Sequence, residues 1–178
     1  MVLVTLGVMP APRKTNPVVT PSHTLQANVK MTPEAAAILQ RACMNCHSNE
    51  TRWPLYSQFA PFSWLVVRDV QRARKLINFS EWSVQAGRRP ELAASTLAAT
   101  CTDMTAGRMP TAAYLIVHPE AKLSKQDIQT YCAWTKQEVS RQIEIKRRQR
   151  DGRPSESSTS VRKARLLPRI YKTPTNRS

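Results

Sequence analysis

The residues with the clearest chemistry are Cys43, Cys46 and His47, which form a Cys-x-x-Cys-His motif. Covalent attachment of a c-type haem requires this spacing. On a helix the two thiols stand one turn apart on one face, where each can form a thioether with a haem vinyl group. His47 follows them as the proximal ligand of the iron. The motif therefore predicts one haem c, bound covalently through Cys43 and Cys46.

Two other interpretations use the same cysteines, as half of a zinc site or as a thiol–disulfide redox pair. Zinc needs two further ligands, and the candidates Cys101, His118 and Cys132 are scattered singly along the chain. A redox pair commonly lies at a strand-to-helix junction and gives no role to His47. The zinc interpretation remains an alternative, in which the chain is a zinc-stabilised basic module that binds nucleic acid.

Further motifs follow the cysteines in a recognisable order. They are Cys46 to Pro54, Tyr56-Ser57, Ala60 to Trp64, Asn78 to Trp82, Gly107-Arg108-Met109-Pro110 and Tyr114 to Pro119. Together they resemble the small bacterial haem-binding domain family that carries one Cys-x-x-Cys-His, from about Asn16 to about Gln137. The chain departs from the family at Leu55, where a second tryptophan is expected, and at Thr111, where proline often follows Met-Pro. The resemblance implies a c-type haem protein and leaves its reaction undefined.

The sixth iron ligand decides what the haem can do. An axial methionine makes the iron six-coordinate and raises its reduction potential, which suits electron transfer. An open position instead admits peroxide or a diatomic gas. We expect Met109 to be this ligand, because it lies in a loop that Pro110 stiffens. His118 competes, although Pro119 beside it favours a structural role. The other candidates are Met44 between the cysteines, Met104 on a helical apolar stripe, and His23 in a proline-rich segment.

Four residues after the motif are candidates for contact with the porphyrin. Trp53, Tyr56 and Trp64 follow closely enough to wall the ring, and Arg52 could pair with a propionate. Ordinary core packing explains the three aromatic residues equally well, and an exposed arginine is commonly only solvated. We therefore treat all four as candidate cofactor contacts.

The element pattern predicts a small all-α, cytochrome-c-like domain of about four helices around one covalent haem, with flexible tails at both ends. No stretch alternates apolar and polar residues as a sheet requires, whereas four segments repeat apolar residues at helical spacing. The first helix opens at Thr32-Pro33 and carries the cysteines in its last turn. The others begin near Pro61, after Pro90 and at Ser124. The second is expected to turn inward Phe62, Leu65, Val66, Val70, Ala73 and Ile77.

Cys101 and Cys132 remain after haem attachment, each on the inner face of its helix. An even remainder outside the cytoplasm favours a disulfide between the third and fourth helices, and two buried free thiols are the alternative. Such a cross-link would stabilise the fold by roughly 3 kcal/mol.

The chain is expected to divide into three parts. Residues 1–30 read as a truncated signal or anchor remnant followed by a proline-rich linker. Residues 31–140 form the haem domain, and residues 141–178 a basic helix extension and disordered tail that holds +9 of the formal net charge of +15. Because c-type haem is attached outside the cytoplasmic membrane, we expect the protein to be periplasmic or exported, with a membrane anchor at the N-terminus.

Two functions of different kinds follow from these features. The first is a monohaem electron carrier, which is not an enzyme, whose basic surface steers docking to an acidic redox partner protein. The second is a haem enzyme or sensor with an open distal position. The basic tail could also contact an anionic membrane surface. Nucleic acid is a less favoured partner, because no aromatic residues are interleaved with the tail's charges.

Overall fold

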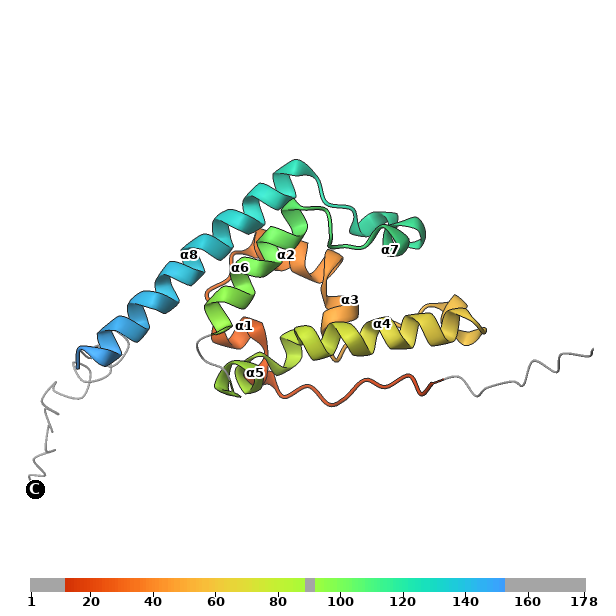
Figure 1. The fold of residues 1–178 in the computed structure, drawn as a ribbon, viewed down its shortest axis with the longest axis horizontal. Helices are drawn as coiled ribbons and strands as arrows, with labels where there is room; N and C mark the ends of the chain where they lie inside the picture. Colours follow the sequence, from red (N-terminus) through yellow and green to blue (C-terminus); the bar gives the residue numbers. More distant parts are fainter. Residues whose placement is uncertain (1–11, 89–91, 153–178) are drawn as a thin grey trace, which may run out of the picture. The chain divides into compact units, whose positions relative to one another are not determined.

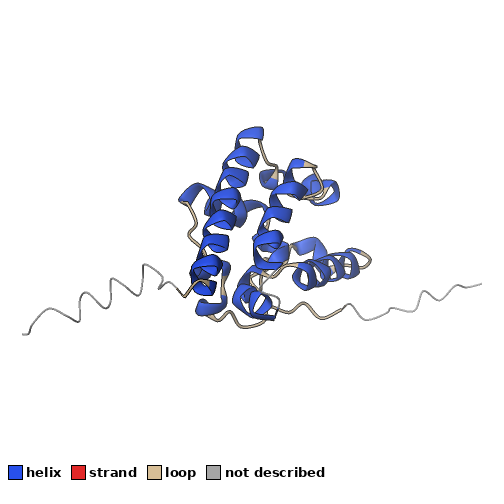
Figure 2. Cartoon of the chain, turned by 60° about the vertical axis from the view of Figure 1, so that its left-hand side comes forward, coloured by secondary structure: helices blue, strands red, loops and turns tan. Residues whose placement is uncertain are grey.

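The computed structural model describes residues 12–88 and 92–152, and every regular element in these ranges is helical, as predicted (Figures 1 and 2). The α-helices are α1 (Leu25–Asn28), α2 (Pro33–Ala42), α3 (Met44–His47), α4 (Phe62–Leu76), α5 (Trp82–Arg88), α6 (Leu92–Thr105), α7 (Ala112–Val117) and α8 (Lys125–Arg150). The 3-10 turns are η1 (Pro21–His23), η2 (Leu55–Gln58), η3 (Phe79–Glu81) and η4 (Pro119–Ala121). The four expected helices correspond to α2, α4, α6 and α8. The shorter helices were not expected from the periodicity.

The chain divides into two compact units between Val139 and Ser140. In the second unit, the end of α8 carries exposed ion pairs along its own face. The Arg148 Nε donates to Glu144 Oε1 at 2.8 Å, an i,i+4 pairing that supports a helix. Among the described residues, no helix is both long and apolar enough to cross a membrane. Residues 1–11 of the predicted signal remnant and linker, and most of the predicted tail, from residue 153, lie outside the described residues.

Polar caps begin two of the expected helices. At the start of α2, the Thr32 Oγ1 accepts a hydrogen bond from the Ala35 amide at 3.2 Å, and Pro33 occupies the first turn. Before α8, the Asp127 amide donates to Ser124 Oγ at 3.0 Å and the Ser124 amide donates to Asp127 Oδ2 at 2.8 Å. This reciprocal pair is the capping box that the Ser124 to Asp127 spacing predicts.

The first predicted helix is interrupted at the cysteine motif. Helix α2 ends at Ala42, and Cys43, with φ of −125°, caps both α2 and the short α3 that follows. The His47 amide still donates to the Cys43 carbonyl at 3.0 Å, so the motif keeps one helical turn of its own. The prediction of one continuous helix is therefore wrong. The break buries Met44 in the core and leaves both cysteines half-buried.

Helix α4 buries a different face from the one predicted. Val70 and Ala73 lie inward as expected, but Phe62 is 53% exposed and Leu65 is 42% exposed. The buried face is completed instead by Ser63 and Val67. The apolar pattern of α4 is wide enough to admit two faces, and the neighbours available for packing select the one that contains the small Ser63.

The main core joins α2, α6 and α8 with residues that precede α2. The Trp134 Nε1 on α8 donates to the Lys30 carbonyl at 2.7 Å, which satisfies a buried indole nitrogen. Leu25 is fully buried and Val29 nearly so, so the end of the segment predicted as an extended linker belongs to the domain. The buried core residues are Leu25, Val29, Ala35, Ile38, Leu39, Met44, Phe79, Trp82, Leu97, Met104, Tyr131 and Trp134.

Helices α6 and α8 run side by side and are joined by the predicted disulfide between Cys101 and Cys132 (Figure 1). The residues directly before the two cysteines are also joined, because the Thr100 and Tyr131 hydroxyls share a hydrogen bond of 3.1 Å. The covalent link and this hydrogen bond fix the register of the two helices. The alternative of two free thiols at these positions is wrong.

Removing this disulfide should cost a large part of the stability. Replacing Cys101 and Cys132 together with serine is expected to lower the free energy of unfolding by about 3 to 4 kcal/mol, because the link closes a long loop in the unfolded chain. Denaturant unfolding of the oxidised protein measures this difference. A reductant should lower the wild type to the level of the variant. Equal stability of the wild type with and without reductant would contradict the prediction.

Candidate functional site

One cavity of the domain gathers the predicted thiol, imidazole and thioether groups. It measures about 300 Å³ and lies between the motif, the end of α4 and α6. Its lining residues are Ala42, Cys43, His47, Leu76, Ile77, Phe79, Thr96, Ala99, Thr100, Asp103, Met104 and Met109. Most of these side chains are apolar or small, and the polar groups are few, as in pockets that hold organic cofactors.

The hydrogen bond of the His47 ring determines which nitrogen faces away from the backbone. Its Nδ1 lies 3.1 Å from the Ile77 carbonyl oxygen, which can only accept, so Nδ1 carries the proton. The Nε2 atom therefore keeps its lone pair, the form in which imidazole binds a metal. Burial is the main cause that lowers the pKa of His47 and so favours the neutral ring, against the smaller opposing effect of this backbone hydrogen bond.

The two motif cysteines are free thiols with weak acidity. Burial raises the pKa of Cys43 to about 12, with a further increase from the charge of Cys46. Burial also raises the pKa of Cys46 to about 11, and the nearby Asp69 adds to this increase. Reactive redox cysteines depend on the opposite shift, a lowered pKa that exposes the thiolate at neutral pH. This environment does not suit a thiol–disulfide redox pair.

The structure also bears on the zinc interpretation, which needed ligands from Cys101, Cys132 or His118. Cys101 and Cys132 are bonded to each other. Both ring nitrogens of His118 have partners, Nε2 at 3.0 Å from the Tyr56 hydroxyl and Nδ1 at 3.0 Å from Glu120 Oε1. Within the described residues, no three His, Cys, Asp or Glu side chains form a group that could hold a metal ion.

Asn45, between the two cysteines, fixes the motif to its surroundings. Its side-chain Oδ1 accepts from the Arg52 amide at 2.8 Å, and its Nδ2 donates to the Tyr114 hydroxyl at 3.1 Å. Its carbonyl accepts from the Thr51 hydroxyl at 2.8 Å. These contacts join the motif to the loop after it and to α7. The middle of the motif is therefore held in place independently of the two thiols.

Arg74 of α4 ties the loop after the motif to the N-terminal segment. Its Nε donates to the Ser48 carbonyl at 2.7 Å and its Nη1 to the Thr15 carbonyl at 2.7 Å. Its Nη2 lies 2.8 Å from the Thr51 hydroxyl and 3.0 Å from Asn16 Oδ1. One guanidinium thus satisfies four acceptors from two segments, the kind of planar multidentate contact that arginine makes.

The candidates for a second iron ligand are separated by their positions. Met109, 36% exposed, and the buried Met104 both line the cavity with His47. Met44 is buried in the core outside the lining. His118 is stacked on Tyr114 with ring centroids 4.3 Å apart, and His23 lies 3.9 Å from Glu81; neither belongs to the lining. Among the five candidates, only the two methionines of the lining share the cavity with His47.

The other predicted contacts lie outside the cavity. Arg52, Trp53, Tyr56 and Trp64 are absent from its lining, and so is Cys46. Tyr56 instead uses its hydroxyl on His118 and packs edge-on against Phe62, with ring centroids 6.4 Å apart. Arg52 is exposed, whereas the two tryptophans are half-buried. These contacts remain predictions that the cavity geometry does not support directly.

Sequence reasoning missed the wall of the cavity that α6 provides. Thr96, Ala99, Thr100 and Asp103 follow the spacing of one helix face and leave room beside it because three of them are small. That run of small residues was the available signal. The Ile77 carbonyl, which orients His47, could not be identified from residue types, because every residue carries a carbonyl.

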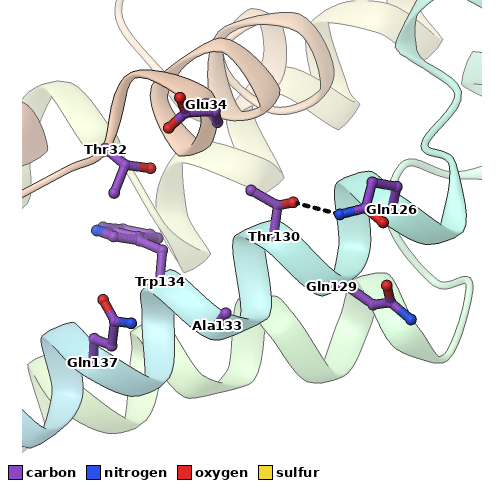
Figure 3. A pocket seen from close by; sticks show the side chains of 8 residues that line it. All are labelled: Thr32, Glu34, Gln126, Gln129, Thr130, Ala133, Trp134 and Gln137. Atoms are coloured by element: carbon purple, nitrogen blue, oxygen red, sulfur yellow. Dashed lines mark hydrogen bonds between the residues drawn. The ribbon is translucent and has the colours of Figure 1, made fainter.

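A second, larger hollow of about 450 Å³ lies between the start of α2 and α8 (Figure 3). Its lining is made of amides, hydroxyls, one carboxylate and Trp134, and the Gln126 side chain donates to the Thr130 hydroxyl at 3.4 Å. It contains no thiol, imidazole or thioether. The chemistry of the lining, rather than volume, therefore identifies the cavity beside His47 as the candidate site.

Comparison with known proteins gives one match. A family model described as a haem-binding domain matches residues 1–137. No curated protein and no solved structure matches the chain.

Proposed function

Because the chain belongs to the haem-binding domain family, we propose that the cavity beside His47 holds one haem c and that the protein carries electrons. The observation that carries this proposal is the position of His47. Its Nδ1 is bound to the Ile77 carbonyl, and its ring shares a cavity with Cys43 and Met109. This arrangement supports the proposal, in which His47 would be the proximal nitrogen ligand, Cys43 a covalent anchor and Met109 the thioether of the distal side.

The residues of the cavity fit a porphyrin in their chemistry. Leu76 is 76% exposed and Met109 is partly exposed at the rim, and a flat apolar ring would cover both. Leu65 and Phe62 lie 11 and 14 residues before Leu76 on α4, which places all three on nearly the same face of the helix. The exposed apolar face therefore extends from the cavity rim toward the start of α4. The cavity volume lies at the lower end of the range for cofactor sites.

Covalent attachment would use the thiols of Cys43 and Cys46. In each addition the sulfur bonds to one vinyl carbon and the thiol hydrogen goes to the other, so that no group leaves and no external oxidant is consumed. The reaction needs reduced thiols, and both cysteines are free in the structure.

The separate disulfide between Cys101 and Cys132 is typical of proteins in an oxidising compartment. It supports the proposed location outside the cytoplasmic membrane.

With Met109 as distal ligand, the bound haem would supply one-electron transfer at a raised potential. The chain would orient His47 through Ile77 and hold Met109 in its loop. The basic surface would favour an acidic redox protein as partner, and the tail could add contact with anionic lipid. Nucleic acid remains a less favoured partner.

One observation favours a second candidate function, an enzyme or sensor with an open distal position. Asp103 lines the cavity, where a carboxylate could accept a proton from a bound peroxide. We prefer the electron carrier for two reasons. The Asp103 carboxylate is already paired with Arg108, and Met109 is available as the sixth ligand of the iron.

The test is an absorption spectrum with a pyridine haemochrome assay, on protein exported from a host that has the c-type maturation machinery. A covalent haem with a low-spin spectrum and a methionine–iron charge-transfer band is the expected result. A covalent haem with a high-spin spectrum would favour the enzyme or sensor. A colourless, zinc-containing protein would overturn both.

A further inference from the structure

The loop that carries Met109 is attached to the last turn of α6, chiefly through Asp103. The Asp103 carbonyl accepts hydrogen bonds from the Arg108 amide at 2.9 Å and from the Met109 amide at 3.3 Å. Between Asp103 and Arg108 the chain turns at Gly107, whose φ of +67° is one that glycine adopts without strain. The Gly107 amide donates to the Met104 carbonyl at 3.1 Å, as in a helix C-cap. The backbone position of Met109 thus depends on the last turn of α6.

The side chain of Asp103 binds the same loop a second time. Both Nε and Nη2 of Arg108 lie on the Oδ1 atom of Asp103, at 2.8 Å and 2.6 Å. Arg108 immediately precedes Met109, so this ion pair restrains the backbone next to Met109. Asp103 also lines the cavity, together with Met104 and Met109. The restraint therefore lies at the wall of the site.

We propose that Asp103 and Arg108 are positioning residues that hold Met109 at the distal side of the haem iron and keep small exogenous ligands out. The inference rests on the proposed function, in which Met109 is the distal ligand. Without the ion pair, the loop keeps its backbone contacts but samples a wider range of positions. Each departure of Met109 opens the iron, and a competing ligand binds in proportion to the open fraction.

A purely structural role for the pair would have a different signature. The Arg108 and Asp103 side chains are 59% and 38% exposed, and exposed ion pairs contribute little to global stability. Removing the pair should therefore change ligand access more than it changes the unfolding temperature. Two single variants separate the partners: Arg108→Gln leaves the carboxylate, and Asp103→Asn leaves the guanidinium. Arg108→Lys keeps the charge but loses the planar two-nitrogen contact.

The experiment uses the full chain with its haem and titrates the ferric protein with imidazole at neutral pH. Arg108→Gln and Asp103→Asn are expected to bind imidazole about threefold to tenfold more tightly than the wild type. Both should also have a weaker methionine–iron charge-transfer band, and Arg108→Lys should fall between. The matched control is Arg68→Gln, which breaks the exposed pair of Arg68 with Asp69 and should leave imidazole affinity unchanged.

The outcomes distinguish the inference from the function on which it rests. A wild type that has the charge-transfer band, with variants that bind imidazole no more tightly, would overturn the positioning role and leave the electron carrier intact. A wild type without the band would overturn Met109 as ligand, and the positioning role with it. A similar gain in affinity in Arg68→Gln would also overturn it, because the effect would then follow from lost surface charge.

Discussion

Replacing Cys43 and Cys46 together with serine is expected to abolish covalent haem attachment. Serine has nearly the shape of cysteine but cannot form the thioether, so no covalent bond remains between the chain and the porphyrin. Haem staining after denaturing electrophoresis measures the bound fraction, which should fall from nearly complete to background. His47 and the cavity wall would remain, so some non-covalent haem could still bind and would be extracted by acidified organic solvent.

The matched control removes the other two cysteines. Replacing Cys101 and Cys132 with serine should leave covalent haem staining in the folded fraction, because neither residue belongs to the cavity lining. Each single variant of the motif, at Cys43 or at Cys46, should keep one thioether and shift the reduced haemochrome band toward longer wavelength. Full staining of the Cys43→Ser, Cys46→Ser double variant would contradict haem c as the cofactor.

Replacing Met109 with leucine is expected to convert the haem iron from low spin to high spin and to lower its reduction potential by on the order of 0.1 V. Leucine nearly conserves the volume of methionine, so the loop can keep its packing while the thioether is lost. The methionine–iron charge-transfer band of the ferric protein should disappear. Absorption spectra and a potentiometric titration measure these two changes.

Met104 provides the matched control, since it is the other methionine of the cavity lining. It is buried and its side chain belongs to the main core, so Met104→Leu should keep the band and the potential while changing stability by less than about 1.5 kcal/mol. If Met104→Leu removes the band and Met109→Leu does not, the two methionines exchange roles. If neither variant changes the spectrum, the distal ligand is not a thioether of this cavity.

Local signals in the sequence are sufficient to predict the starts of two helices and the pairing of two cysteines. Thr32 before Pro33, and Ser124 three residues before Asp127, predicted caps that the structure contains. Such caps depend on atoms only a few residues apart, so local sequence determines them. The Cys101 and Cys132 pair was also predictable, because both lie on inner faces of neighbouring helices.

Contacts between distant segments were beyond sequence reasoning. The inward residues expected for α4 included Phe62 and Leu65, whereas the structure buries Ser63 and Val67. Periodicity gives the number of apolar faces on a helix but not which neighbour covers each one. From its residue type His118 is a candidate iron ligand, and only the folded chain brings Tyr56 to its Nε2 across 62 residues.

The sequence by itself determined which groups the proposed haem site has to work with, through the spacing of Cys43, Cys46 and His47 and the presence of Met109 downstream. The tertiary structure alone decided the walls of the cavity, the orientation of His47 by the Ile77 carbonyl and the attachment of the Met109 loop to Asp103. The physical reason is that residue types carry reactivity, whereas a cavity and a backbone hydrogen bond exist only where segments separated in sequence meet in the folded chain.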